Sequence, residues 1–523
     1  MTIGEMPNEE RDRLHWPMLL IAIGLAVATW VLTGSLVGER EPGGPSLSPQ
    51  GRAALAVTVL TAACWLLRAM PLAAASFLPL ALFPTFGVTT MKQASTAYAD
   101  PILWMFFGGF VLALAIERCG LHRRVALRVV GWIGAAPRRL VLGMLAASTL
   151  LSMWINNTAT TLALLPIGWA LVERVSHAGA LSDRDARRFG IAMMLGIAYG
   201  ASVGGVATPI GTAPNLLFFS VWRPFVDAGA PPFAFLDWLL AFVPFAVGFS
   251  FLIWIVLTRI LFRLPATAGE GSARLLDDVA NLPPMSSAEK RVAALFALAV
   301  IAWVTREDVS FGDGHVIAGW ASRVGAPEIK DGTVAIGIAI LAFLIPGGGR
   351  GSPPLMDWAT ARRIPFEILF LLGGGVAIAD ALGGTGASAV FGAALAPVLD
   401  DVPAWLAVGI VVAFLTFLTE VASNTAITAL MLPLLLETAR QAGLDPRLLL
   451  LPATIAASCG FMMPIGTPPN AIVYATGKVT MREMAWAGIW LNLASIVTLT
   501  AVMWFWALPL LGIDPNVRPT WLK

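Results

Sequence analysis

Long apolar runs recur along nearly the whole chain, and they limit the possible folds more than any other feature of the sequence. Of the 523 residues, 57% are hydrophobic and only 13% are charged. Helices satisfy their own backbone hydrogen bonds in lipid, whereas a membrane β-barrel needs alternating segments of about 10 residues. The sequence lacks such alternation and therefore predicts an all-α polytopic membrane protein.

The apolar windows also predict where the chain crosses the membrane and in which direction. Spans are expected at 17–37, 52–68, 71–86, 101–118, 187–210, 236–262, 288–306, 331–346, 364–383, 447–465 and 484–511. The first run is longer than the core of a signal peptide, so we expect it to be retained. Basic residues concentrate on one side, as in Arg118, Arg123, Arg124, Arg128, Arg138 and Arg139. The positive-inside rule makes this side cytoplasmic, with the N-terminus inside and the C-terminus outside the cell (inner) membrane.

Two further apolar runs are interrupted by similar polar stretches. They cover 139–172, with W-I-N-N-T-A-T-T at its centre, and 402–438, with V-A-S-N-T-A-I-T. The arms after these centres, 159–172 and 426–438, rise only about 20 Å, against a hydrocarbon core of about 30 Å. We therefore predict two re-entrant helical hairpins with tips near mid-membrane. Broken backbone at this depth is tolerated only inside protein or beside a water-filled cavity.

A second pair of matching motifs indicates that the chain is an internal repeat. V-G-G-V-A-T-P-I-G-T-A-P-N at 203–215 resembles S-C-G-F-M-M-P-I-G-T-P-P-N at 458–470. Proline removes a backbone donor and clashes with the preceding turn, so both helices should open there. By the predicted topology, the first copy enters from the cytoplasm and the second from outside. Inverted repeats with discontinuous helices are the architecture of secondary transporters.

These patterns divide the chain into consecutive parts. We expect an N-terminal segment with the first span (1–50), a first repeat (51–263), a linker (264–287), a second repeat (288–512) and a C-terminal tail (513–523). The first repeat should contain the hairpin 139–172 and a broken helix at 187–225. The second should contain the hairpin 402–438 and a broken helix at 447–476.

The tips and breaks together offer groups for both a cation and an anion. An opened helix exposes carbonyl oxygens at one end and amide hydrogens at the next start, which suit a small cation and an anion respectively. Asparagine adds a neutral oxygen and an NH₂ group. Such polar residues can also merely bond neighbouring helices. Four clusters in repeat-matched positions, each beside a helix breaker, favour a binding site.

The same motifs resemble a known family. The two N-T-A hairpin centres, the G-T-x-P-N breaks and G-G-F-V-L-A-L-A-I-E-R-C-G-L-H-R-R at 108–124 resemble the divalent anion/sodium symporters, the INDY-type di- and tricarboxylate transporters. The resemblance runs from about residue 50 to 512. It implies a homodimer in the membrane, with each protomer divided into a scaffold and a transport domain that moves like an elevator. The function implied is sodium-coupled import of C4–C6 di- or tricarboxylates such as succinate, malate or fumarate, and not an enzymatic activity.

The resemblance also implies which residues bind the ions and the substrate. One sodium ion would be held by Ser152, Asn157 and Gly211, and the other by Thr419, Ala422, Asn424 and Gly466. The substrate carboxylates would meet Asn156, Asn157, Thr158, Thr212, Ser423, Asn424, Thr425, Thr467 and Pro468. Asn156 departs from the pattern because the family usually has serine there. An amide is longer than a hydroxyl, so it could change which substrates fit.

Charge supports the coupling to sodium independently of the resemblance. A dicarboxylate carries about two negative charges, yet neither tip nor break contains Lys or Arg. Because desolvating a charge without compensation is costly, bound sodium ions should supply the compensation. Glu420 precedes the second tip and could relay protons or orient the hairpin through hydrogen bonds. We favour the orienting role.

Several other functions remain as alternatives. A protein of the same fold could exchange dicarboxylates without sodium, or carry sulfate or another divalent anion. A related fold that handles arsenite or exchanges sodium for protons fits the motifs less well. A membrane-embedded enzyme would need a catalytic set such as metal-ligating His and Asp, which the predicted spans lack. The basic cluster after residue 117 could bind anionic lipids, but we favour a cytoplasmic interfacial helix leading into the first hairpin.

Overall fold

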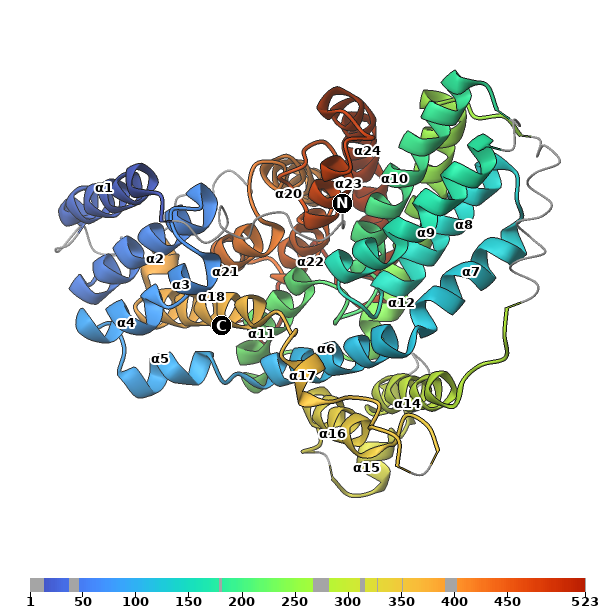
Figure 1. Ribbon diagram of the computed structural model, residues 1–523. Helices are drawn as coiled ribbons and strands as arrows, with labels where there is room; N and C mark the ends of the chain where they lie inside the picture. Colours follow the sequence, from blue (N-terminus) through green and yellow to red (C-terminus); the bar gives the residue numbers. More distant parts are fainter. Residues whose placement is uncertain are drawn as a thin grey trace.

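The protein folds almost entirely into helices (Figure 1). The computed structural model describes residues 14–36, 47–177, 181–266, 282–310, 316–326, 328–349, 351–390 and 402–522. Within these ranges, extended structure is limited to a small antiparallel ribbon of β1 (Val309–Ser310) and β2 (Val316–Ile317) and a bridge between Pro346 and Pro354. The all-α prediction is confirmed. The centre of the predicted linker, 267–281, and residues 1–13 and 37–46 of the N-terminal segment lie outside the described residues.

The helices fall into two series along the chain. The first contains α1 (Trp16–Leu32), η2 (Thr33–Leu36), α2 (Pro49–Leu67), α3 (Leu72–Ala75), α4 (Leu78–Thr85), α5 (Met91–Ala97), α6 (Pro101–Cys119), α7 (Leu121–Ile133), α8 (Pro137–Ser152), α9 (Asn157–His177), α10 (Asp183–Gly205), α11 (Ala213–Asp227), α12 (Phe235–Ile255) and the π-helical η3 (Val256–Leu261). The second contains α14 (Ser287–Val304), α15 (Trp320–Arg323), α16 (Asp331–Leu344), α17 (Trp358–Ala361), α18 (Phe366–Gly384), α20 (Ala404–Leu418), α21 (Asn424–Gln441), α22 (Arg447–Ala456), α23 (Pro468–Ala475), α24 (Met481–Val502), the π-helical η4 (Met503–Ala507) and α25 (Leu508–Leu510).

Both predicted helical hairpins are present, and both predicted broken helices are broken. The hairpins are α8–α9 and α20–α21, and the breaks separate α10 from α11 and α22 from α23. The second arms are longer than predicted, since α9 has 21 residues and α21 has 18. Each continues through an internal proline, Pro166 or Pro433. At about 1.5 Å per residue these arms measure about 27–31 Å, so arm length alone does not make the hairpins re-entrant.

The first hairpin lies close to the first broken helix because α10 presents glycines to it. Gly200 and Gly204 are four residues apart and therefore lie on one face of α10. A Cβ atom on Gly204 would lie 2.2 Å from the carbonyl oxygen of Thr149, and one on Gly200 would lie 2.7 Å from that of Leu145. Only glycine permits this approach of two helix backbones. The contact fixes the tip of α8–α9 beside the break after Gly205.

Other helices form two groups beside these elements (Figure 1). α2 packs against α1, α4 and α18, while α6 packs against α14 and α16. The amphipathic helix α7 connects α6 to the first hairpin, as predicted for the basic segment after residue 117. Its Arg124 forms a 2.7 Å ion pair with Glu289 at the start of α14. The preceding Arg118 pairs with Asp357 at 2.6 Å, so two ion pairs hold the junction between α6 and α7.

The apolar surface is consistent with a multi-pass membrane protein. Among the described residues, five helical stretches are long and apolar enough to cross a bilayer. They are Pro49–Leu67, Met91–Cys119, Phe235–Leu261, Phe366–Gly384 and Met481–Leu510. Shorter apolar helices cover most of the remaining predicted spans. The predicted span 71–86 is divided into α3 and α4, which meet at Ser76 and Phe77.

Candidate functional site

The first hairpin tip and the first break form one polar cluster. Ser152, at the end of α8, donates a 2.8 Å hydrogen bond from its hydroxyl to Oδ1 of Asn157, the first residue of α9. A Cβ atom on Gly205 would lie 2.3 Å from this same Oδ1. Likewise, a Cβ atom on Gly211 would lie 2.4 Å from the carbonyl oxygen of Gly205. The structure therefore brings together the three residues that the resemblance assigns to the first sodium ion.

Asn215, the last residue of the motif, holds the first break open. Its Nδ2 donates to the carbonyl oxygens of Gly205 at 3.0 Å and Thr208 at 2.7 Å. These are carbonyls that an opened helix leaves without intrahelical partners. Trp238 of α12 donates at 2.9 Å to the carbonyl oxygen of Val206 in the same break. The break is therefore a fixed structure rather than a frayed helix end.

The second half repeats these contacts at corresponding positions. Thr419 takes the place of Ser152, and its single O–H is shared between two acceptors, Oδ1 of Asn424 and the carbonyl oxygen of Ala457 at 2.9 Å. Asn470 takes the place of Asn215, with Nδ2 donating to the carbonyl oxygens of Gly460 at 3.2 Å and Met463 at 3.1 Å.

Gly466 completes the second cluster. A Cβ atom on it would lie 3.1 Å from the carbonyl oxygen of Thr419. Ala422 is buried beside these residues in the turn before α21. The residues assigned to the second sodium ion thus lie in one region.

Both breaks contain a buried oxygen that lacks a partner. Oδ1 of Asn215 and Oδ1 of Asn470 make no hydrogen bond within the described part of the chain, and both side chains are fully buried. The orientation of each amide is fixed, because its Nδ2 already donates to carbonyl oxygens. Such an orphaned oxygen is costly unless something binds it. Its chemistry fits a cation, not an anion.

The starts of α11 and α23 supply groups of the opposite polarity. Thr212 and Thr467 are buried N-cap residues of these helices, and Thr467 accepts from the backbone N–H of Asn470. α11 packs against α21 of the second hairpin, and α23 packs against α9 of the first hairpin. Each broken helix therefore reaches the hairpin of the other half. The partially positive helix starts suit the carboxylates of an anion.

The remaining substrate candidates lie at the hairpin tips. Asn156 is half-buried and caps α9, because its Oδ1 accepts from the backbone N–H of Ala159 at 2.8 Å. Its counterpart Ser423 makes no such cap. Thr158 and Thr425 are half-buried in the first turns of α9 and α21, whereas Pro468 is exposed at the start of α23.

The carboxylate of Glu420 lies against the second break. It accepts hydrogen bonds from the backbone N–H groups of Phe461, Met462 and Met463 at 2.7, 2.9 and 2.8 Å. Nδ2 of Asn492 in α24 donates to the same carboxylate at 2.6 Å. This arrangement supports the orienting role. Asn492 was missed by the sequence analysis, although a lone amide in the apolar helix α24 was the available signal.

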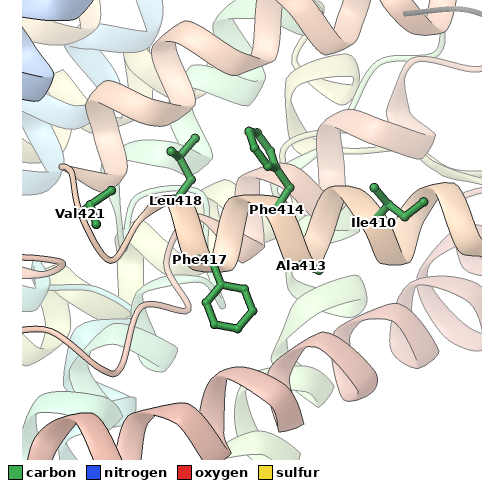
Figure 2. Close-up of a pocket in the computed structure, with 6 residues that line it drawn as sticks. All are labelled: Ile410, Ala413, Phe414, Phe417, Leu418 and Val421. Atoms are coloured by element: carbon green, nitrogen blue, oxygen red, sulfur yellow. The ribbon is translucent and has the colours of Figure 1, made fainter. Parts of the chain in front are cut away.

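An apolar groove runs along the first arm of the second hairpin (Figure 2). Ile410, Ala413, Phe414, Phe417 and Leu418 of α20 line it, with Val421 in the turn beyond the helix end. None of these side chains offers a polar atom to an anion. The groove is therefore separate in chemistry from the polar cluster at the tip, although Val421 adjoins it.

Two hairpins and two broken helices, repeated with matching polar contacts, define a secondary transporter. A family model described as the sodium:sulfate symporter transmembrane region matches residues 25–512. The chain belongs to this family, the divalent anion/sodium symporters predicted from the hairpin and break motifs. It is 36% identical to the sodium-dependent dicarboxylate transporter SdcS of Staphylococcus saprophyticus, over 97% of this chain and 95% of that protein. It is 34% identical to SdcS of Staphylococcus aureus, over 90% of this chain and 88% of that protein.

Solved structures share the fold at much lower identity. The YdaH transporter of Alcanivorax borkumensis has a TM-score of 0.57 and 14% identity, covering 94% of this chain and 98% of that one. MtrF of Neisseria gonorrhoeae also has a TM-score of 0.57 and 14% identity, covering 96% of this chain and 97% of that one. At this identity the likeness concerns the fold alone.

Proposed function

We propose that this protein is a sodium-coupled secondary transporter that imports C4–C6 di- or tricarboxylates. Its relatives are named sodium-dependent dicarboxylate transporters, and they align with it over nearly their whole length. The polar clusters provide a reason why the activity should extend to this chain. They combine neutral oxygens and helix starts, the two kinds of group that a cation and an anion need.

The two sodium sites would use oxygens of the tips and breaks. Ser152, Asn157 and Gly211 would hold one ion, and Thr419, Ala422, Asn424 and Gly466 would hold the other. The orphaned Oδ1 atoms of Asn215 and Asn470 support this assignment, since each lies in a break beside one of these sets. Sodium is a hard cation and prefers such oxygen ligands.

The substrate would lie between the halves. Its carboxylates would meet the tips at Asn156, Asn157, Thr158, Ser423, Asn424 and Thr425, and the helix starts at Thr212, Thr467 and Pro468. Because Oδ1 of Asn156 already caps α9, its NH₂ group remains to donate to a carboxylate. The packing of α11 on α21 and of α23 on α9 supports a site shared by both halves.

The observation that carries the proposal is the absence of positive charge from this shared polar region. The tips and breaks contain amides, hydroxyls and glycines but neither Lys nor Arg. A dianion desolvated where no positive charge compensates it is strongly disfavoured. Two bound sodium ions would neutralise its charge, so substrate affinity should depend on sodium. Uptake would then follow the sodium gradient.

Each of the two repeats, 51–263 and 288–512, would contribute helices to a moving domain and to a fixed domain. We infer that both hairpins, both broken helices and the helices that hold them, α12 and α24, form the transport domain. The remaining helices would form a scaffold and the contact between two protomers of a homodimer. Elevator-like motion of the transport domain would expose the site on each side in turn, with the N-terminus cytoplasmic and the C-terminus outside.

The family model's description favours one second candidate, the transport of sulfate or another divalent anion. Uptake into proteoliposomes distinguishes the candidates. Succinate, malate, fumarate, citrate and sulfate would each be tested with an inward gradient of sodium, and with potassium or choline in its place. We expect dicarboxylate uptake only with sodium. Undiminished uptake in potassium or choline would overturn the coupling, and counterflow without sodium would then identify an exchanger.

A further inference from the structure

The two breaks differ in how their backbone N–H groups are satisfied. In the first half, the N–H groups of Val206 and Ala207 bond to the carbonyl oxygens of Val203 and Gly204, at 3.3 and 3.1 Å, as the last turns of α10. In the second half, the N–H groups at the corresponding positions, Phe461 and Met462, point to a carboxylate instead. Successive backbone N–H groups arranged in this way form a concave anion-binding surface.

Glu420 occupies that surface as a charged group. Its two oxygens accept four hydrogen bonds, three from backbone N–H groups and one from the side chain of Asn492. All four partners are donors, so the geometry is that of a carboxylate ion, which only accepts. The side chain is only 4% exposed, and water therefore screens its charge little.

This charge lies beside only one of the two proposed sodium sites. Glu420 is adjacent in sequence to Thr419, and a Cβ atom on Gly466 would lie 3.1 Å from its Oε2. In the first half the corresponding position is Met153, between Ser152 and the tip. A buried negative charge close to a cation site raises the affinity for the cation, whereas methionine supplies no charge.

We propose that Glu420 is a positioning residue that makes the second-half sodium site the tighter of the two, so that this site fills first. It does so by holding the Phe461–Met463 loop in place and by adding a fixed negative charge. This inference rests on the proposed sodium-coupled function and extends it to an inequality between two sites of like geometry.

The test compares variants of full-length protein by sodium titration. Glu420→Gln keeps the size of the side chain but removes the charge and most of the acceptors. We expect it to raise the sodium concentration for half-maximal uptake at least tenfold, more than it raises the substrate KM measured at saturating sodium. Glu420→Asp keeps the charge and should restore part of the sodium affinity. Glu437→Gln is the matched control, because it neutralises another buried carboxylate on the same hairpin, near the end of α21 that is farther from the tip.

A second measurement remains valid even if Glu420→Gln does not fold. Sodium-induced thermal stabilisation without substrate would be followed in Thr419→Val and Ser152→Ala, since ligands stabilise the state they bind. The response at low sodium should be lost in the first variant and kept in the second. The opposite result, or an unchanged sodium midpoint in Glu420→Gln, would overturn the inference. If the wild-type protein shows neither sodium-dependent uptake nor stabilisation, the proposed function itself fails.

Discussion

At the break of the first half, the backbone N–H groups of Val206 and Ala207 bond within α10. At the break of the second half, the corresponding N–H groups bond to a carboxylate of the hairpin, that of Glu420. One polar contact of the tips is nevertheless the same in both halves, because Ser152 bonds to Asn157 as Thr419 bonds to Asn424. The two halves therefore share the side-chain contact that links each hairpin arm to its tip asparagine, but they differ in the groups that hold the broken helix. This pattern is expected if binding the ligands constrains the tips in both halves but does not constrain the contacts that hold the broken helices.

The packing behind the two clusters differs in the same way. Gly204 allows the backbones of α8 and α10 to touch, while the corresponding position in the second half is Cys459. Trp154 at the first tip stacks against Phe235 and meets the edge of Phe296. Its counterpart Val421 is 62% exposed. The first tip is thus enclosed by aromatic rings, whereas the second tip is exposed at the matching position.

The largest expected effect comes from filling the close contact of the first half. In Gly204→Ala, the new Cβ would lie 2.2 Å from a backbone oxygen, which cannot rotate away. Overpacking of this kind should cost about 3 kcal/mol or more. Thermal unfolding and size-exclusion profiles in detergent measure the loss. Gly337→Ala is the control, because nothing lies within 4 Å of its new Cβ.

Alanine can be placed at the matching position of the second half, Cys459. Because this position already holds a side chain, Cys459→Ala should cost only about 1 kcal/mol. Equal losses in the two variants would show that the halves are packed alike.

The amides that hold the breaks should matter unequally. Asn215→Leu leaves the carbonyl oxygens of Gly205 and Thr208 without their donor, at a cost of about 2–4 kcal/mol. Asn470→Leu should cost about half as much, because Glu420 and Asn492 also hold the second loop. Thermal unfolding and sodium-dependent uptake would both be measured. A more severe loss in Asn470→Leu would contradict the difference in support.

The tips can be compared directly by making the first resemble the second. Trp154→Val removes two aromatic contacts, with ring centroids 6.2 Å from Phe235 and 5.0 Å from Phe296. Aromatic pairs contribute about 0.5–1.5 kcal/mol each beyond burial, so we expect a loss of about 1–3 kcal/mol. Val421→Ala, at the matching exposed position, should change unfolding by about 0.5 kcal/mol or less. Similar losses in both would mean that the first tip is not anchored by its tryptophan.

The sequence predicted the hairpins and the broken helices better than the contacts that hold them in place. Apolar runs and prolines were enough to locate both hairpins and both breaks, because lipid restricts backbone to helices and proline opens them. The extra length of α9 and α21 was missed because each helix begins at the asparagine of its tip and continues beyond the apolar run into polar residues at its end.

The hydrogen-bond partners of Glu420 could not be predicted from the sequence, for a different reason. Its bonds span 41 to 72 residues of chain, and no local pattern indicates which amides will face a given carboxylate. The motif ends Asn215 and Asn470 were visible as repeats. Their contacts with Gly205 and Gly460 depend on how each loop folds back, which the spacing does not fix.

The smallest expected change in stability concerns Asn156, where the tips differ by a single amide. Asparagine and serine are about equally good helix caps, so Asn156→Ser should change unfolding by about 0.5 kcal/mol or less, whereas Asn156→Ala should lose about 1 kcal/mol. Asn156→Ser nevertheless removes the NH₂ group that we expect to face the substrate. Its order of KM values among succinate, malate, citrate and sulfate should therefore change while its stability does not. An unchanged order of KM values in Asn156→Ser, together with the loss of stability in Asn156→Ala, would mean that Asn156 only caps α9. Selectivity for the anion would then depend on the second tip, with Ser423.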